Sequence, residues 1–244
     1  MLEDSYYTLM DTQYCRFRHC CPDVDSELCT WQCKSCDGIN YLMSTSNLPK
    51  KYQKHQDLSY DIIELPKTVD YLQQMEGNMV FFVDQGYNAY FYGDIGTGKT
   101  SWAVRMLTTY FSKICHTGEH HVAGLFISVP EILRNIKFYM THKNESFREI
   151  IELLPKVNLV VWDEMFQTDP TSFESQWLYS LVNSRVLNQK SNIYTSNISP
   201  DDLAFKDKRL YSRVCLESDC VEFIGNDARG GKKFSNNFSE ESSN

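Results

Sequence analysis

Two periodicities of hydrophobic and polar residues alternate along the chain from Tyr87 onward. Short apolar runs, typical of buried strands, are followed by longer segments in which apolar residues recur every three or four positions. Strands are expected at residues 88–92, 124–129, 157–162, 192–195 and 221–224. Helices are expected at residues 66–76, 99–116, 130–140, 145–154, 173–187, after Ser199 and at 209–216. This alternation predicts an α/β fold with a central parallel sheet flanked by helices.

The sequence before this alternating region is different in character. Residues 1–36 are rich in cysteine and tyrosine and show little amphipathic periodicity, and residues 37–60 are polar enough to suggest a connector. The chain is therefore expected to divide into a Cys-rich domain at 1–48, a linker at 49–64, an α/β domain at 65–229 and a disordered tail at 230–244.

Composition and charge restrict the class of protein. Of the 244 residues 42% are hydrophobic, which is enough for a sizeable core. The longest purely apolar run, Met79–Val83, is too short to span a membrane, and the N-terminus lacks the features of a secretory signal. We therefore expect a soluble, cytoplasmic protein with no membrane partner. The net charge of −8 means that any contact with nucleic acid must be local.

Six of the nine cysteines lie between residues 15 and 36. In a reducing cytoplasm such a cluster favours metal binding over disulfides. Four thiolates could hold a tetrahedral Zn²⁺ in a segment too small for its own core, and we expect Cys15, Cys20, Cys33 and Cys36 to bind it. Cys21, Cys29 and His19 are further candidates. A reduced or oxidation-sensitive segment is the alternative.

A glycine-rich segment joins the strand expected at 88–92 to the helix expected at 99–116. Its residues, Gly93, Asp94, Ile95, Gly96, Thr97, Gly98, Lys99 and Thr100, match the phosphate-binding pattern G-x4-G-K-[ST] in full. The glycines let backbone N–H groups curl around a phosphate at the positive end of the helix. Lys99 is expected to reach the β- and γ-phosphates, and Thr100 to bind Mg²⁺. An ordinary glycine-rich turn would lack this flanking strand and helix.

Polar residues follow two of the other expected strands. Asp163 and Glu164 end the strand at 157–162, which is expected to neighbour the strand of the phosphate loop. There Asp163 would help to hold Mg²⁺, and Glu164 would polarise the water that attacks the γ-phosphate. Asn197 follows the strand at 192–195, where its amide could orient that water, although an ordinary loop asparagine would look the same. Together these residues favour a site that hydrolyses ATP.

These stretches, in this order, resemble the AAA+ ATPases of the DnaC/DnaI group of bacterial helicase loaders, which includes phage-encoded members and the related IstB transposition helpers. The resembling segments are Gly93–Thr100, Leu125–Leu133, Leu159–Glu164, Tyr194–Asn197 and Arg209–Arg213. The resemblance covers residues 60–229 and implies a P-loop AAA+ core without a C-terminal lid domain. It also implies that Arg213 acts as an arginine finger in the ATP site of a neighbouring subunit, supported by Arg209, and that Arg229 lies near the nucleotide. An ordinary surface arginine is the alternative for Arg213.

The resemblance further implies a function in DNA replication in a bacterial or phage-infected cell. The chain would bind a hexameric replicative helicase through its zinc-binding N-terminal domain and load it onto single-stranded DNA, with slow ATP hydrolysis as a switch. The stretch Arg134–Tyr139 carries basic and aromatic side chains suited to single-stranded DNA, although its aromatic residues could equally belong to the core.

Three other functions share the phosphate-binding loop. An IstB-like helper of a DNA transposase would use the same core, but a zinc-binding head and an acidic chain argue against it. A small-molecule phosphotransferase would need a base for its substrate and an Arg-rich lid, and neither is evident. A third alternative is a helicase adaptor or inhibitor that binds ATP without hydrolysing it. The presence of Glu164 is the single argument against this alternative.

Overall fold

A sheet of five parallel strands forms the centre of the computed structural model, which describes residues 34–53, 58–115, 121–141, 145–166 and 170–225. The strands are β1 (Asn88–Gly93), β2 (Gly124–Ser128), β3 (Leu159–Asp163), β4 (Ser191–Ser196) and β5 (Asp219–Phe223). Their order across the sheet is β2-β3-β4-β1-β5, and every neighbouring pair is parallel. The predicted α/β fold with a parallel sheet is therefore confirmed.

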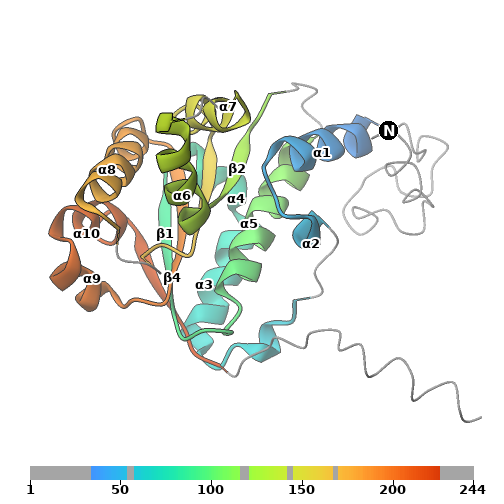
Figure 1. The fold of residues 1–244 in the computed structure, drawn as a ribbon. Coiled ribbons are helices and arrows are strands. Elements are labelled where there is room, and N and C mark those ends of the chain that lie inside the picture. Colours follow the sequence, from blue (N-terminus) through green and yellow to red (C-terminus); the bar gives the residue numbers. More distant parts are fainter. Residues whose placement is uncertain (1–33, 54–57, 116–120, 142–144, 167–169, 226–244) are drawn as a thin grey trace, which may run out of the picture.

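Helices cover both faces of the sheet (Figure 1). One face carries α1 (Lys34–Thr45), α2 (Lys50–Gln53), a 3₁₀ turn η3 (Tyr60–Ile62), α3 (Pro66–Gly77), α4 (Met79–Asp84) and α5 (Lys99–Ile114). The other carries α6 (Val129–Thr141), α7 (Glu145–Leu153), α8 (Ser172–Leu187), α9 (Pro200–Lys206) and α10 (Lys208–Val214). Within the described residues, the helices of the first layer all precede β2 in the sequence, and those of the second layer all follow it. None of its helices is long and apolar enough to cross a membrane.

Alternating strand residues supply the two halves of the core. In β1, Ala89 and Phe91 pack with the layer that contains α5, whereas Tyr90 packs with the layer that contains α8. All five residues of β3 are buried. Strands buried on both faces read as continuous apolar runs, which explains why the apolar run at 157–162 predicted a strand.

Residues 37–60 do not form the connector that their polar composition suggests. They contribute most of α1 and all of α2, and Ile39, Leu42 and Met43 of α1 are buried in the same core as α5. These three apolar residues lie at helical spacing, so one face of α1 is hydrophobic although its composition is polar. The division predicted at residues 48 and 49 therefore falls between two helices of one core.

The segment after α1 also covers one edge of the sheet. The backbone N–H of Phe126 in edge strand β2 donates to the carbonyl of Ser46 at 2.8 Å, and the Asn47 amide donates to the Phe126 carbonyl at 3.0 Å. These bonds satisfy backbone groups that an edge strand otherwise exposes. Ser46 and Asn47, which lie almost fifty positions before the phosphate loop, thus cover part of the edge of the sheet.

The amino-terminal end of the sheet is held by the buried guanidinium of Arg185, which lies in the last turn of α8 and is 0% exposed. It donates to the carbonyls of Leu154, Val157 and Ser191 and to the side-chain oxygen of Asn192. Burial lowers the pKa of Arg185 to about 9, so the group stays charged at neutral pH. Each of these acceptors is a neutral oxygen, so hydrogen bonds rather than a carboxylate compensate the buried charge.

Asn192 extends this network across three strands. Its side-chain oxygen also accepts from the indole N–H of Trp162 in β3 at 2.9 Å. Its amide donates at 2.8 Å to the side-chain oxygen of Asn88 in β1. The order β3-β4-β1 is therefore fixed by side chains as well as by the backbone ladder.

Replacing Arg185 with alanine is expected to lower the free energy of unfolding by about 3 kcal/mol or more. Several buried acceptors would lose their donor, and each such loss costs about 1–3 kcal/mol. Urea denaturation followed by circular dichroism measures the change. The matched control is Arg148→Ala, because the exposed pair of Arg148 with Glu152 is worth only about 0.2–0.5 kcal/mol. Equal losses in the two variants would contradict the structural role of Arg185.

Candidate nucleotide-binding site

The glycine-rich segment predicted to bind phosphate forms the turn between β1 and α5. Gly93, Gly96 and Gly98 have φ values of 137°, 88° and 90°, in the left-handed region that side chains disfavour. A Cβ atom at Gly93 would also collide with the backbone carbonyl of Phe223 in β5. The glycines at 93, 96 and 98 are therefore required by the backbone of the loop.

Lys99, the first residue of α5, turns its side chain back into this loop. Its ammonium donates to the carbonyls of Gly93 at 2.7 Å and of Asp94 at 2.6 Å, and the residue is only 7% exposed. The Thr97 hydroxyl closes the loop by donating to the Asp94 carbonyl at 2.9 Å. A buried positive charge thus lies inside the curl of the backbone, where a phosphate chain would need it.

The Asp163 carboxylate lies against the first turn of α5. Its Oδ1 accepts hydrogen bonds from the hydroxyls of Thr100 and Thr195, both at 2.7 Å. Strand β3 does not neighbour β1, contrary to the expectation from the sequence, because β4 lies between them. Thr195 of β4 occupies this intermediate position, so Asp163 meets Thr100 across an intervening strand.

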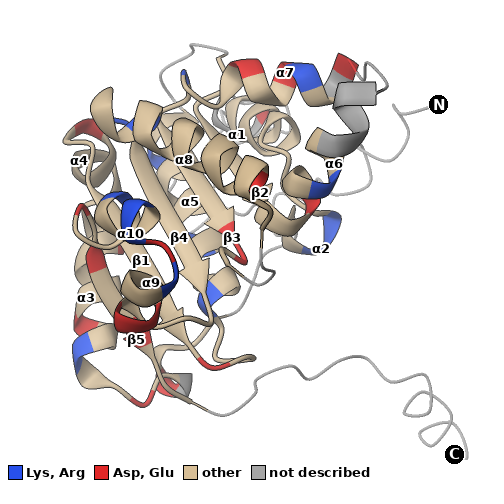
Figure 2. Cartoon of the chain, turned by 60° about the vertical axis from the view of Figure 1, so that its left-hand side comes forward, with Lys and Arg blue, Asp and Glu red and all other residues tan. Residues whose placement is uncertain are grey.

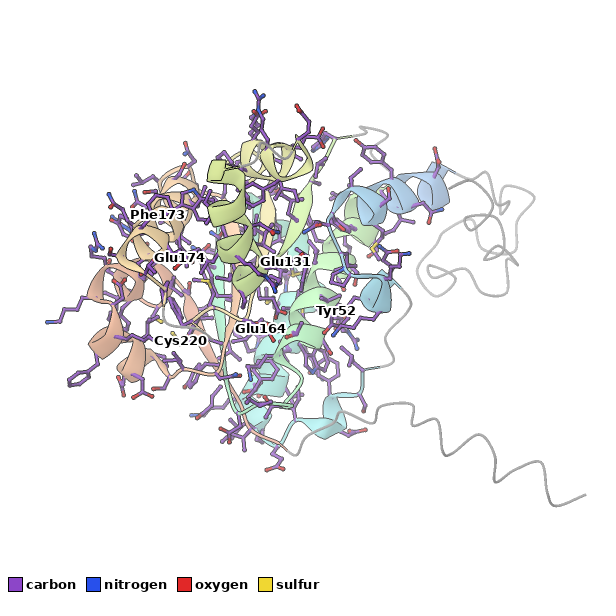
Figure 3. The ribbon with its side chains drawn as sticks, in the orientation of Figure 1. Tyr52, Glu131, Glu164, Phe173, Glu174 and Cys220 are labelled. Carbon is purple, nitrogen blue, oxygen red and sulfur yellow. The ribbon has the colours of Figure 1, made fainter. Side chains whose placement is uncertain are left out.

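Glu164 begins a strained turn directly after β3. It has a φ of 59°, and Phe166 two residues later has a φ of 66°, a conformation that costs energy for residues other than glycine. Thr195 supports this turn twice: its hydroxyl accepts from the Glu164 N–H at 3.0 Å, and its carbonyl accepts from the Met165 N–H at 2.8 Å. The exposed side chain of Glu164 lies near the centre of the molecule in Figure 3.

The two other predicted catalytic residues are placed differently. Asn197 is exposed and follows Ser196, the last residue of β4, so it lies at the same edge of the sheet as Glu164. Arg213 lies in the last turn of α10, where it pairs with Glu217 at 3.2 Å. Among the described residues no recorded contact joins Arg213 to the phosphate loop of its own chain. Its Nε is buried without a hydrogen-bond partner in that part of the chain.

An aromatic cluster that the sequence did not predict supports the start of α5. Trp102 is fully buried next to Gly98, its ring lies 4.6 Å from that of Tyr60, and the Arg105 guanidinium lies 4.9 Å from its centre. Arg105 also pairs with Glu76 at 2.8 Å. Burial and the hydrogen bond to Glu76 raise the pKa of Tyr60 to about 12. These contacts fix the segment before α3 against the helix that begins at Lys99.

The zinc site predicted from the cysteine cluster falls almost wholly outside the described residues. Cys15, Cys20 and Cys33 lie there, and Cys36 belongs to α1 but its side chain is not described. In the part of the chain that the structure does describe, no group of three or more His, Cys, Asp or Glu side chains could hold a metal. Arg229 and the tail predicted at 230–244 also lie outside the described residues, so the expected absence of a lid domain stays a prediction.

The described residues fit a nucleotide with magnesium. Lys99 supplies the positive charge for phosphates. The Thr100 hydroxyl and the Asp163 carboxylate, 2.7 Å apart, are the oxygen ligands that Mg²⁺ prefers. In Figure 2 the acidic residues appear in red at the end of β3. Thr195 is the residue of this site that the sequence did not predict. It belongs to the Thr195–Asn197 segment, in which the sequence pointed to Asn197 instead.

Comparison with solved structures places this arrangement in a known architecture. The DnaC helicase loader matches with a TM-score of 0.56 and 17% identity, over 72% of this chain and 100% of that one. DnaI matches with a TM-score of 0.57 and 17% identity, over 75% of this chain and 94% of that one. No protein-family model and no curated protein matches the sequence.

A third solved structure is the replication initiator DnaA, described as bound to AMPPCP and single-stranded DNA. It matches with a TM-score of 0.51 and 16% identity, over 77% of this chain and 50% of that one. The chain therefore shares the fold of the DnaC helicase loader and of DnaI. The resemblance that the sequence motifs indicated is confirmed at the level of the fold.

Replacing Lys99 with alanine is expected to abolish tight ATP binding, because it removes the charge that the loop holds at the phosphate position. Lys113→Ala is the matched control, since Lys113 is an exposed lysine in the last turn of the same helix. Titration with a fluorescent ATP analogue measures both affinities. Equal affinity in the Lys99 variant and the unmodified protein would contradict the assignment of the site.

Proposed function

We propose that this chain is an ATPase that binds a replicative DNA helicase and loads it onto single-stranded DNA. The observation that carries the proposal is the match to two helicase-loader structures over 94–100% of their chains, combined with the arrangement of Lys99, Thr100 and Asp163. A P-loop alone is common to many families, whereas a match over nearly the whole length of the DnaC helicase loader and of DnaI supports a role in replication. Hydrolysis acts as a switch in this proposal.

The residues at the carboxyl ends of β1, β3 and β4 divide the chemistry between them. Lys99 would exchange its loop carbonyls for the β- and γ-phosphates, and Thr100 and Asp163 would hold Mg²⁺, which would neutralise charge on the phosphates. Glu164 accepts the proton of the attacking water, and Asn197 orients that water. The exposed positions of Glu164 and Asn197 at one sheet edge support these roles.

Arg213 completes the site of a neighbouring subunit in this proposal. Lys99 and Mg²⁺ leave part of the transition-state charge on the γ-phosphoryl oxygens, and a supplied arginine is worth about 10³–10⁵ in rate in P-loop GTPases. Among the described residues no contact joins Arg213 to the phosphate loop of its own chain, and this supports donation to a second chain. Subunits would therefore associate through the ATP site.

Contact with single-stranded DNA is assigned to α6. Arg134 and Asn135 are exposed on this helix, whereas Ile136 is buried in the core. The first two residues of the stretch predicted to bind DNA therefore lie on the surface, and the third lies in the core. The side chains at 137–139 are not described. Among the described side chains of α6, Arg134 carries the positive charge for this contact, and such a local contact is compatible with a chain whose net charge is −8.

The helicase contact is assigned to the cysteine-rich segment at 1–48 with one bound Zn²⁺. This part of the proposal rests on the spacing of Cys15, Cys20, Cys33 and Cys36.

Affinity purification from the source cell, followed by mass spectrometry, tests the proposed function. The replicative helicase is expected in the eluate of the full chain. The double variant Cys33→Ser, Cys36→Ser is expected to lose both the zinc, measured by elemental analysis, and the helicase. Cys115→Ser, which changes a buried cysteine outside the cluster, is the matched control. A transposase in place of the helicase would overturn the proposal in favour of an IstB-like helper.

Replacing Arg213 with alanine is expected to leave ATP binding nearly unchanged while abolishing hydrolysis and ATP-dependent assembly on single-stranded DNA. Mixing Arg213→Ala chains with Lys99→Ala chains should restore part of the activity. One type of interface in the mixture then contains both an intact loop and an intact arginine. The rate of phosphate release per chain, measured at several protein concentrations, checks both expectations.

Lys208→Ala is the control, because Lys208 is exposed on the same helix as Arg213. A rate per chain that does not depend on protein concentration, together with no recovery in the mixture, would show that Arg213 is an ordinary surface residue.

A further inference from the structure

We propose that Thr195 is a positioning residue that sets the orientation of both acids of the site, Asp163 for Mg²⁺ and Glu164 for water. The inference deepens the proposed function and rests on it for the identity of the ligand. Its basis is a pair of hydrogen bonds made by one hydroxyl, which is buried at the carboxyl end of the strand between β1 and β3.

The first bond determines which oxygen of Asp163 is available. Oδ1 accepts from both Thr100 and Thr195 at 2.7 Å, so the lone pairs of that oxygen are committed to the two hydroxyls. Among the described residues, no hydrogen bond is recorded to Oδ2 of Asp163. The carboxylate is therefore held in one rotamer, with Oδ2 as the oxygen left for a metal ion or its water. Without Thr195, Thr100 alone would not prevent the two oxygens from exchanging.

The second bond connects the same hydroxyl to Glu164. Thr195 donates its proton to Asp163 and accepts the N–H of Glu164 at 3.0 Å, so its donor and one acceptor position are both used. The Glu164 N–H precedes the Cα whose φ is 59°. The bond therefore helps to hold the left-handed turn that directs the Glu164 side chain away from β3. One hydroxyl thus links the metal acid to the water-activating acid.

A purely structural role for Thr195 would have different consequences. The side chain is 2% exposed, so removing its hydroxyl leaves the Glu164 N–H without its partner and lowers stability whatever the site does. Stability alone is therefore no test. A positioning role predicts a change in the dependence of nucleotide binding on Mg²⁺, with little change in binding when Mg²⁺ is absent, because Lys99 and the loop are untouched.

The experiment compares Thr195→Val, Thr195→Ser and Thr108→Val in the full chain. Valine has nearly the shape of threonine without the hydroxyl, serine retains the hydroxyl, and Thr108 bonds only a carbonyl within α5, at 3.0 Å. Affinity for a fluorescent ATP analogue is measured in EDTA and over a Mg²⁺ titration. Phosphate release and melting temperature are measured in parallel.

For Thr195→Val we expect unchanged affinity in EDTA, a Mg²⁺ midpoint raised about 10–100-fold and a turnover reduced by a similar factor, the range for losing a group that orients a metal ligand. Thr195→Ser should restore both quantities to within about threefold, since it retains the orienting hydroxyl. Thr108→Val should behave as the unmodified protein.

A Thr195→Val protein whose Mg²⁺ midpoint and turnover stay within about twofold of the unmodified values would overturn the inference, because loss of an orienting group costs tenfold or more. A serine variant as impaired as the valine variant would overturn it as well, since the missing methyl group would then be the cause. Failure of the unmodified chain to capture a helicase would refute the proposed function and leave the Mg²⁺ titration a valid test. Failure of the unmodified chain to bind the nucleotide with Mg²⁺ would refute both.

Discussion

The buried bond between Arg185 and Asn192 is the constraint on which the geometry of the sheet depends. It joins the end of α8 to the start of β4, and through Trp162 and Asn88 it fixes the order of three strands. A parallel strand advances about 3.3 Å per residue, so strands anchored at one end have defined positions at the other. The relative positions of the loop at Gly93, of Asp163 and of Thr195 follow from an interaction at the opposite end of the sheet.

Much of this fold could be predicted from the sequence because its signals are local. The apolar run before Asp163 and the pattern Gly93–Thr100 each predict an element or a loop without knowledge of its neighbours. The order of parallel strands is not a local property, so nothing in the sequence placed β4 between β1 and β3. The role of Thr195 depends on that order and was therefore missed for the same reason.

The helix α1 shows a second limit of sequence reasoning. Its composition is polar, and only three of its apolar residues, Ile39, Leu42 and Met43, are buried at helical spacing. A pattern this short is a weak signal for a helix. The proposed zinc-binding segment includes this helix, to which Cys36 belongs, and α1 packs against α5, which begins at Lys99. The helix α1 therefore links the proposed helicase contact to the helix of the phosphate site.

The bonds that Ser46 and Asn47 make to Phe126 have a consequence for assembly. Edge strand β2 already has partners for its outward N–H and C=O groups at this position, so a strand from another chain cannot add there without displacing them. In the assembly proposed above, the edge of a second copy could not pair with β2 at Phe126 without first displacing Ser46 and Asn47. The segment after α1 thus acts as a cover for part of an edge that would otherwise be open to cross-β pairing.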